Sequence, residues 1–147
     1  MKHYRHGVVR RLANAAMTGL VRLRIGPKGN HLLTTRGCRS GKPHTTPVTI
    51  VDLDGERWLV APYGLVGWVH NARAAGAVTL SRGRTSQNFS VSEVDASRAA
   101  PVLKRYVAIA PIVLPYFEAY RTSPVEEFEA DAGTHPVFLL KPLDGTR

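Results

Sequence analysis

The chain has 147 residues, 44% of them hydrophobic, which is enough for one folded domain with its own core. A single cysteine, Cys38, excludes an internal disulfide framework and favours a reducing cytoplasm, and no apolar run approaches the roughly 18 residues that a membrane-spanning helix needs. The net charge of +9 leaves two interpretations, a merely soluble basic protein or a protein with an anionic partner.

The N-terminal third carries the excess positive charge and begins with a predicted helix. Residues 1–51 contain ten of the twenty Lys and Arg residues and none of the eleven acidic ones, an asymmetry that attracts nucleic acid, an anionic membrane face or a phosphorylated cofactor. Apolar residues at three- and four-residue spacing predict a basic amphipathic helix over about residues 5–25, and we read no signal peptide there. This helix either packs on the domain, lies on an anionic membrane surface or shields a substrate pocket.

The next segment predicts two strands around a basic loop that is bracketed by glycines. The strands cover His31–Thr35 and Thr45–Leu53, and the loop runs from Gly37 to Gly41. Exposed backbone N–H groups beside the guanidinium of Arg39 favour a phosphate or a carboxylate. The spacing is not that of a Walker loop, and the alternative interpretation is a plain hairpin whose basic residues face solvent.

Turn and cap signals predict three helices in the rest of the chain. One helix begins at Gly67 and ends at Gly76, and Asp95 caps a second. The third is expected to start at Ser123-Pro124, because three glutamates follow within its first turns, where the helix dipole favours carboxylates.

Short apolar segments between these helices predict the remaining strands. Asp54-Gly55 is a strong hairpin signal between the second strand and the third. The further strands are expected at Arg57–Ala61, Ala77–Ser81, Ser86–Val94 and His135–Leu140. Six strands, mainly antiparallel and joined by short helices, predict an α+β fold: a small six-stranded β-barrel, closed or half-open, with peripheral helices, in a single domain.

Familiar catalytic patterns are missing from the chain. The six histidines are scattered without metal-ligand spacing, so no metal site is expected, and there is no G-x-S-x-G elbow. Cys38 stands beside Arg39 in a polar loop, an arrangement that is more often inert than nucleophilic. These absences favour a cofactor as the source of any redox or group-transfer chemistry.

A second cluster, from Val60 to Asn71, joins a strand end to a helix start. Gly64 and Gly67 allow a close backbone approach, while Tyr63 and Trp68 provide flat apolar faces with polar tips. Beside the basic loop, this cluster would form a groove with an anion clamp at one end and aromatic walls at the other, which suits a planar phosphorylated cofactor. The alternative is that Trp68 is a core residue that anchors a short helix.

Taken together, these motifs resemble a known family. The segments LLTTRGCRSGKPHTTPVTI and DGERWLVAPYG, followed by a W-x-x-N helix, resemble the deazaflavin-dependent nitroreductases, and the late PYF and HPVF segments extend the match to residues 30–140. The resemblance implies a split β-barrel oxidoreductase that uses coenzyme F420. It also implies hydride transfer from the reduced cofactor to a quinone, a nitroaromatic or an activated alkene.

The resemblance also assigns site residues. It implies that the basic loop holds the cofactor's phosphate and acidic tail; Cys38 stands where relatives carry a basic residue, so Lys42 or Arg36 would supply that contact. Nitro-reducing relatives often carry other residues at Thr49 and Tyr63, which leaves nitro reduction itself in question. The residues assigned to the cofactor are Arg39, Ser40, Gly41, Lys42, Pro47, Val48, Thr49, Ala61, Pro62, Tyr63, Gly64, Trp68 and Asn71.

The implied mechanism needs little chemistry from side chains. Arg39 and the amides of Ser40 and Gly41 would fix the anionic tail, and the substrate would stack on the exposed ring face. The proton that completes the reduction comes from solvent or from one of three tyrosines. These candidate catalytic residues are Tyr63, Tyr116 and Tyr120.

The same residues are compatible with other functions and partners. The barrel could hold FMN instead of F420, or it could carry F420, FMN or a lipophilic ligand without turnover. Nucleic acid is not expected as a partner, since few aromatic residues interleave with the basic ones. We expect a small-molecule substrate, a monomer or homodimer, and a cytoplasmic location with peripheral membrane contact through the N-terminal helix as an alternative.

Overall fold

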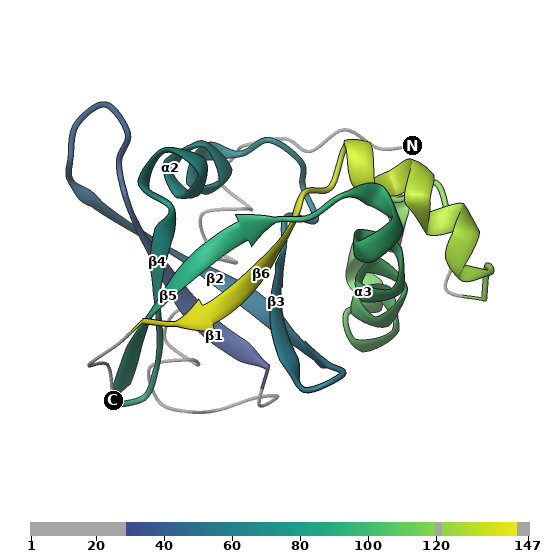
Figure 1. Ribbon diagram of the computed structural model, residues 1–147, viewed down its shortest axis with the longest axis horizontal. Helices are drawn as coiled ribbons and strands as arrows, with labels where there is room; N and C mark the ends of the chain where they lie inside the picture. The colour runs from purple at the N-terminus through teal and green to yellow at the C-terminus, as the bar shows by residue number, and fades with distance from the viewer. Residues whose placement is uncertain (1–28, 120–121, 144–147) are drawn as a thin grey trace.

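A closed antiparallel barrel of six strands forms the centre of the computed structural model, which describes residues 29–119 and 122–143 (Figure 1). The strand order around the barrel is β1-β2-β3-β6-β5-β4, and β4 pairs again with β1. The expected α+β barrel is confirmed, whereas the predicted helix over residues 5–25 lies outside the described residues. The strands are β1 (Asn30–Arg36), β2 (Pro43–Leu53), β3 (Glu56–Val60), β4 (Ala77–Arg82), β5 (Thr85–Glu93) and β6 (Val137–Pro142).

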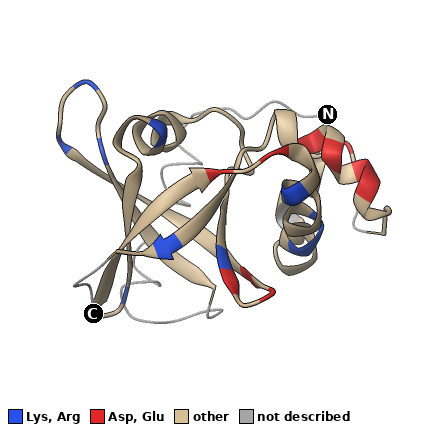
Figure 2. Ribbon diagram, viewed as in Figure 1, with Lys and Arg blue, Asp and Glu red and all other residues tan. Residues whose placement is uncertain are grey.

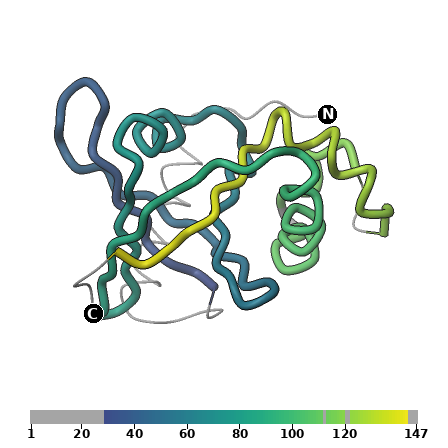
Figure 3. The backbone as a smooth tube through the Cα atoms, viewed as in Figure 1, coloured from purple at the N-terminus to yellow at the C-terminus, as the bar shows by residue number. Residues whose placement is uncertain are grey.

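A tight turn joins β2 and β3 where the sequence predicted it. Asp54 and Gly55 both have positive φ angles, 55° and 76°, which is the backbone of a type I′ hairpin turn between β2 and β3. The β1–β2 connection is longer and comprises residues 37–42. In Figure 3 this loop extends away from the barrel beside the α2 helix.

Apolar residues fill the barrel on the inside and cover it on the outside. On β3, Leu59 points into the barrel, while Trp58 packs outside against the α3 layer. β6 alternates in the same way, with Phe138 inside and Leu139 outside. Each buried side chain of this size contributes about 1.5–3 kcal/mol, so these two strands, covered on both faces, contribute strongly to the stability of the barrel.

Helices cover one end and one side of the barrel. α2 (Gly67–Ala75) lies over one end, with Val69 in the interior core, and ends at Gly76, whose φ is 70°. α3 (Ala96–Ile109) packs on the outer face and is capped by Asp95, as predicted. No helix in residues 29–119 and 122–143 is long and apolar enough to cross a membrane.

Two expectations near the C-terminus need correction. The helix expected from Ser123-Pro124 is the 3₁₀ helix η2 (Val125–Gly133), with a second 3₁₀ helix, η1 (Pro111–Tyr116), before it. The last strand begins at Val137 rather than His135, because the His135 N–H donates to the Asp131 carbonyl at 2.9 Å and stays with the preceding turn. At His135 a short-range hydrogen bond replaces the expected ladder, whereas the Pro136 carbonyl still accepts the Ala61 N–H at 2.9 Å.

Candidate functional site

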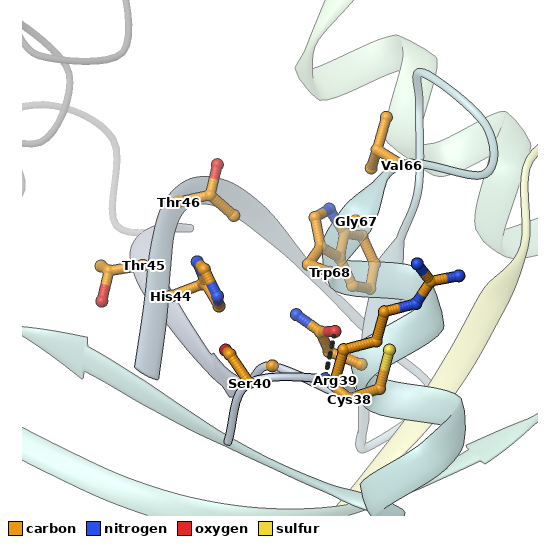
Figure 4. Close-up of a pocket in the computed structure, with 11 residues that line it drawn as sticks. Cys38, Arg39, Ser40, His44, Thr45, Thr46, Val66, Gly67 and Trp68 are labelled. Atoms are coloured by element: carbon orange, nitrogen blue, oxygen red, sulfur yellow. Dashed lines mark hydrogen bonds between the residues drawn. The ribbon is translucent and has the colours of Figure 1, made fainter. Parts of the chain in front are cut away.

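A hollow lies between the β1–β2 loop and the N-terminus of α2. It has a volume of about 480 Å³, and the first residues of β2 form its third side (Figure 4). The loop, the strand and the helix approach one another because β1 pairs with β2 while α2 packs across the same barrel end. The lining residues are Gly37, Cys38, Arg39, Ser40, His44, Thr45, Thr46, Val66, Gly67, Trp68 and Asn71.

Internal hydrogen bonds shape the β1–β2 loop. Gly37 N–H donates to the Lys42 carbonyl at 2.8 Å, and Gly41 N–H donates to the Gly37 carbonyl at 2.9 Å. The Gly41 N–H, which was expected to contact the anion, therefore already has an acceptor within the loop. The Arg39 and Ser40 amides have no partner among the described residues, so these two N–H groups can bind a ligand.

Gly37 lets two side chains come close to the loop backbone. A Cβ at this buried position would lie 2.7 Å from Ser40 Oγ and 2.9 Å from His44 Nε2. Both atoms therefore converge over the same small patch of backbone. A larger residue would push the imidazole and the hydroxyl away from their places on the cavity wall.

Asn71 fastens the loop to α2. Its Oδ1 accepts the Cys38 N–H at 3.0 Å, the dashed line of Figure 4, and its Nδ2 donates to Thr35 Oγ1 at 3.1 Å. Asn71 is buried, so its bond to Thr35 is shielded from water, whereas its bond to the exposed Cys38 is partly buried. The carboxamide is held at both ends. Asn71 thus holds the loop against α2 and also lines the cavity, and its expected contact with a cofactor stays a prediction.

The N-terminus of α2 faces the cavity without a side-chain cap. Val66 stands at the N-cap position and provides no capping oxygen, and the first turn contains no acidic residue. Gly67 and Trp68 belong to the cavity lining, so the positive end of the helix dipole is directed at it. Trp68 also packs against Phe138 with ring centroids 6.0 Å apart. It is therefore both a core anchor and a cavity wall.

The electrostatics of the cavity are one-sided. Arg39 and His44 line it, and the lining contains no carboxylate. In Figure 4, His44 and Ser40 lie on the side of β2, while Arg39 and Trp68 lie toward α2. Arg39 is exposed and forms no ion pair with any described residue. Such a surface attracts an anion.

Most other residues assigned by the resemblance lie outside the lining. Gly41 and Lys42 belong to the loop but not to this cavity, and Ala61 is fully buried in the barrel core. Thr49 donates to Asn30 Oδ1 at 3.0 Å. Gly64 has a φ of 85°, and a Cβ there would lie 3.2 Å from the Thr134 carbonyl. The remaining members of this group, placed on β2 and just after β3 and half-buried, are Pro47, Val48 and Pro62.

The candidate catalytic tyrosines form a separate group. Tyr63 and Tyr116 meet edge to face, with ring centroids 5.1 Å apart and planes at 85°, and neither lines the cavity. Tyr63 is 37% exposed, so part of its side chain faces solvent. Tyr120 lies outside the described residues.

The first residues of β2 were missed by sequence reasoning. His44, Thr45 and Thr46 line the cavity, although only the loop before them and Pro47–Thr49 after them were assigned. A usable signal existed: a polar run directly after an anion-binding loop begins the strand at the cavity mouth, before burial requires apolar residues.

Comparison with known proteins identifies a family and a shared fold. The profile of a family described as F420H(2)-dependent quinone reductase matches residues 5–124. A structure of an F420-H2 dependent reductase, FDR-A, is similar with a TM-score of 0.54 and 20% identity over 78% of this chain and 95% of that one. At this identity the structural likeness concerns the fold.

Two further solved structures share this fold. One, described as a domain-swapped dimer, has a TM-score of 0.56 and 19% identity over 90% of this chain and 93% of that one. The other, a FAD-binding protein from Mesorhizobium loti, has a TM-score of 0.50 and 10% identity over 88% and 89% of the two chains.

Proposed function

The chain belongs to the family of F420H(2)-dependent quinone reductases, and on that premise we propose that it is an enzyme that binds coenzyme F420 and reduces a quinone with it. The observation that carries the proposal is the cavity at the barrel end. No carboxylate lines the cavity, and three kinds of positive or donor group converge there. They are the Arg39 side chain, two loop N–H groups without a partner among the described residues, and the uncapped N-terminus of α2.

The donor set fits the anionic part of such a cofactor. A phosphate oxygen accepts hydrogen bonds from backbone N–H groups and from a guanidinium, and these bonds are stronger than neutral ones. The Arg39 and Ser40 amides and the Arg39 side chain come from the same turn of the loop. Asn71 keeps that turn in place before any ligand arrives.

The rest of the cavity fits a planar ring. Trp68 supplies an aromatic wall and Val66 an apolar one, and about 480 Å³ lies within the usual range for small-molecule sites. Trp68 cannot swing away freely, because it packs against Phe138 in the barrel wall. The ring of a bound cofactor would therefore meet a fixed surface.

The chain's own residues act mainly by orientation in this proposal. When bound, the reduced deazaflavin supplies the hydride. Arg39 and the loop amides hold the anionic part, Trp68 fixes the ring, and the open side of the cavity receives the substrate. Tyr63 or Tyr116 would give the proton to a substrate that reaches the β3–α2 connection, and solvent would do so otherwise. Enones and nitroaromatics are further electron-poor substrates of this proposal.

Fluorescence titration with oxidised F420 tests the site. Arg39→Ala is expected to raise the Kd about 10- to 100-fold, the usual effect of losing a charge-assisted contact to phosphate. Lys42→Ala is the matched control, because it removes the same charge from the same loop at a residue outside the lining. Equal Kd values for wild type and Arg39→Ala would remove Arg39 from this role.

A steady-state assay then tests turnover. Consumption of reduced F420 is followed with a quinone, an enone and a nitroaromatic, and the quinone is expected to give the largest kcat/KM. Binding of F420 without consumption of the reduced form would make the chain a carrier instead. Loss of rate in Tyr63→Phe at unchanged F420 affinity would assign the proton to that hydroxyl.

A flavin is the second candidate ligand of the same cavity. The FAD-binding neighbour of similar fold favours it, and an FMN phosphate would meet the same donors. Titration with FMN beside F420 separates the two, and F420 is expected to bind more tightly. The homodimer, favoured by the domain-swapped neighbour, is checked by light scattering. The cytoplasmic location and the membrane contact stay predictions.

A further inference from the structure

Besides Arg39, His44 is the only side chain of the cavity lining that can carry a positive charge, and no described residue engages it. Its imidazole forms no hydrogen bond with any described residue. By contrast, His31 Nδ1 lies 2.9 Å from the Gly29 carbonyl, and His135 Nε2 lies 2.7 Å from the Tyr116 carbonyl. Two histidines thus form hydrogen bonds within the fold, whereas the imidazole of His44 at the cavity remains available to a ligand.

The geometry directs His44 toward the anion site. Its Nε2 lies 2.9 Å, and Ser40 Oγ 2.7 Å, from the point where a Cβ of Gly37 would stand. A ligand oxygen near that patch would meet the imidazole and the hydroxyl together, next to the unspent amides of Arg39 and Ser40. Lys42 and Arg36, expected to replace the basic residue missing at Cys38, do not line the cavity. The guanidinium of Arg36 instead donates to the Gly41 carbonyl at 3.2 Å.

We propose that His44 is the second cationic contact of the anion that Arg39 binds, so that the grip on the anion weakens as the imidazole loses its proton. The identification of that anion with F420 rests on the proposed function, whereas the contact itself does not. Histidine ordinarily changes charge between pH 5 and 8, and only its protonated form adds positive charge. Affinity for the anion therefore falls as the pH rises and the imidazole loses its proton.

The surroundings of His44 leave the bound anion as its main electrostatic partner. Arg39 and Cys38 are the other titratable groups of the lining, and both come from the loop. On β1, the residue paired with His44 is the neutral Thr35, and α2 contributes the neutral Trp68 and Asn71. Since no carboxylate lines the cavity, the arriving anion is what favours the imidazolium. Binding and proton uptake are thereby linked.

Two substitutions of the same residue test this contact with F420 as the probe. Kd is measured at pH 6 and pH 8 for wild type, His44→Gln and His44→Arg, with His70→Gln, an exposed histidine outside the lining, as the control. His44→Gln is expected to bind about tenfold more weakly than wild type at pH 6 and nearly equally at pH 8. His44→Arg is expected to keep tight binding at both. Ionisation of F420 itself affects all variants alike, so the ratios report His44.

Inorganic phosphate separates this inference from the proposed function. The ring signals of His44 are followed by NMR against pH, with and without phosphate at constant ionic strength. Their titration midpoint is expected to move to higher pH with phosphate in wild type and to move less in Arg39→Gln. A midpoint that phosphate leaves unchanged, or a Kd ratio independent of pH, overturns the inference even if F420 binds. A midpoint that moves while F420 fails to bind overturns the proposed function alone.

Discussion

The two ends of this molecule treat their polar groups in opposite ways. At the cavity, Arg39, His44 and two loop amides point to solvent without a partner among the described residues. At the other end, where α3, η1 and η2 pack together, buried polar groups are fully used. Figure 2 adds the charges: Lys and Arg residues lie on the β1–β2 loop, whereas Asp and Glu residues gather on η2. Hydrogen-bond donors without a partner among the described residues, rather than burial or charge alone, distinguish the candidate site.

Asp131 is an example of a polar group whose side chain is engaged in hydrogen bonds within the fold. Its carboxylate is fully buried and accepts the Glu118 N–H at 2.7 Å and the Ala119 N–H at 3.0 Å. The ring of His135 joins the same region by stacking on Phe117, with centroids 4.1 Å apart, while its Nδ1 lies 3.3 Å from the Ala61 carbonyl. This network fixes the chain between η1 and β6.

The largest expected effect is therefore on stability and belongs to Asp131. Asp131→Ala leaves two N–H groups without their acceptor and is expected to lower the free energy of unfolding by about 3 kcal/mol. This corresponds to a fall in Tm of roughly 10 °C for a chain of this size. Thermal unfolding measures it, with Asp131→Asn, which keeps one acceptor oxygen, expected to lose less. An F420 Kd that rises with the loss of Tm would show that the two ends are coupled.

Asn71 should affect both stability and binding, because it belongs to the fold and to the cavity at once. Asn71→Ala removes the bonds to Cys38 and Thr35 and is expected to cost about 2 kcal/mol of stability. It is also expected to raise the F420 Kd about tenfold, since the loop is no longer held before binding. Asn71→Asp keeps an acceptor for the Cys38 N–H but places a negative charge beside the anion. If Asn71→Ala lowers Tm and leaves Kd unchanged, the loop needs no anchor.

Local signals predicted much of the fold and less of the cavity. Asp54-Gly55, Gly76 and Asp95 act through their own backbone or side chain, so their effects are readable from neighbouring residues. The use of the Gly41 amide depends on how the whole loop closes, which residue types do not encode. The place of His44 likewise depends on α2 lying opposite β2, a contact across the barrel end.

Gly37 gives a smaller effect that concerns only the cavity wall. Gly37→Ala forces His44 and Ser40 outward by steric contact and is expected to raise the F420 Kd several-fold with little change in Tm. Gly41→Ala is the matched control, because its added Cβ meets nothing within 4 Å while its φ of 72° makes the substitution strained. It should lower Tm slightly and leave the Kd closer to wild type. The reverse order would place the anion nearer Gly41.

The smallest expected effect separates the pH dependence of the fold from that of the cavity, and it belongs to His31. Burial is the main cause that lowers the pKa of His31 from its ordinary 6.5; Arg57 and Arg82 add to it and the Gly29 carbonyl opposes it. Because the folded pKa lies below the unfolded one, the unfolded chain takes up the proton first as the pH falls. Full stability is thus present above about pH 6.5 and declines until the folded pKa is passed.

Urea unfolding at pH 7 and pH 5 measures this decline, and His31→Gln is expected to reduce it. Asp95, whose pKa the Arg98 N–H lowers, loses its contribution only below its ordinary value of 3.8 and does not enter this window. Over the same interval, protonation of His44 is expected to tighten anion binding. Acid should therefore loosen the fold and strengthen the grip of the cavity at the same time. If stability and affinity instead change in the same direction, and His31→Gln alters both, the surroundings of His31 and the cavity are not independent.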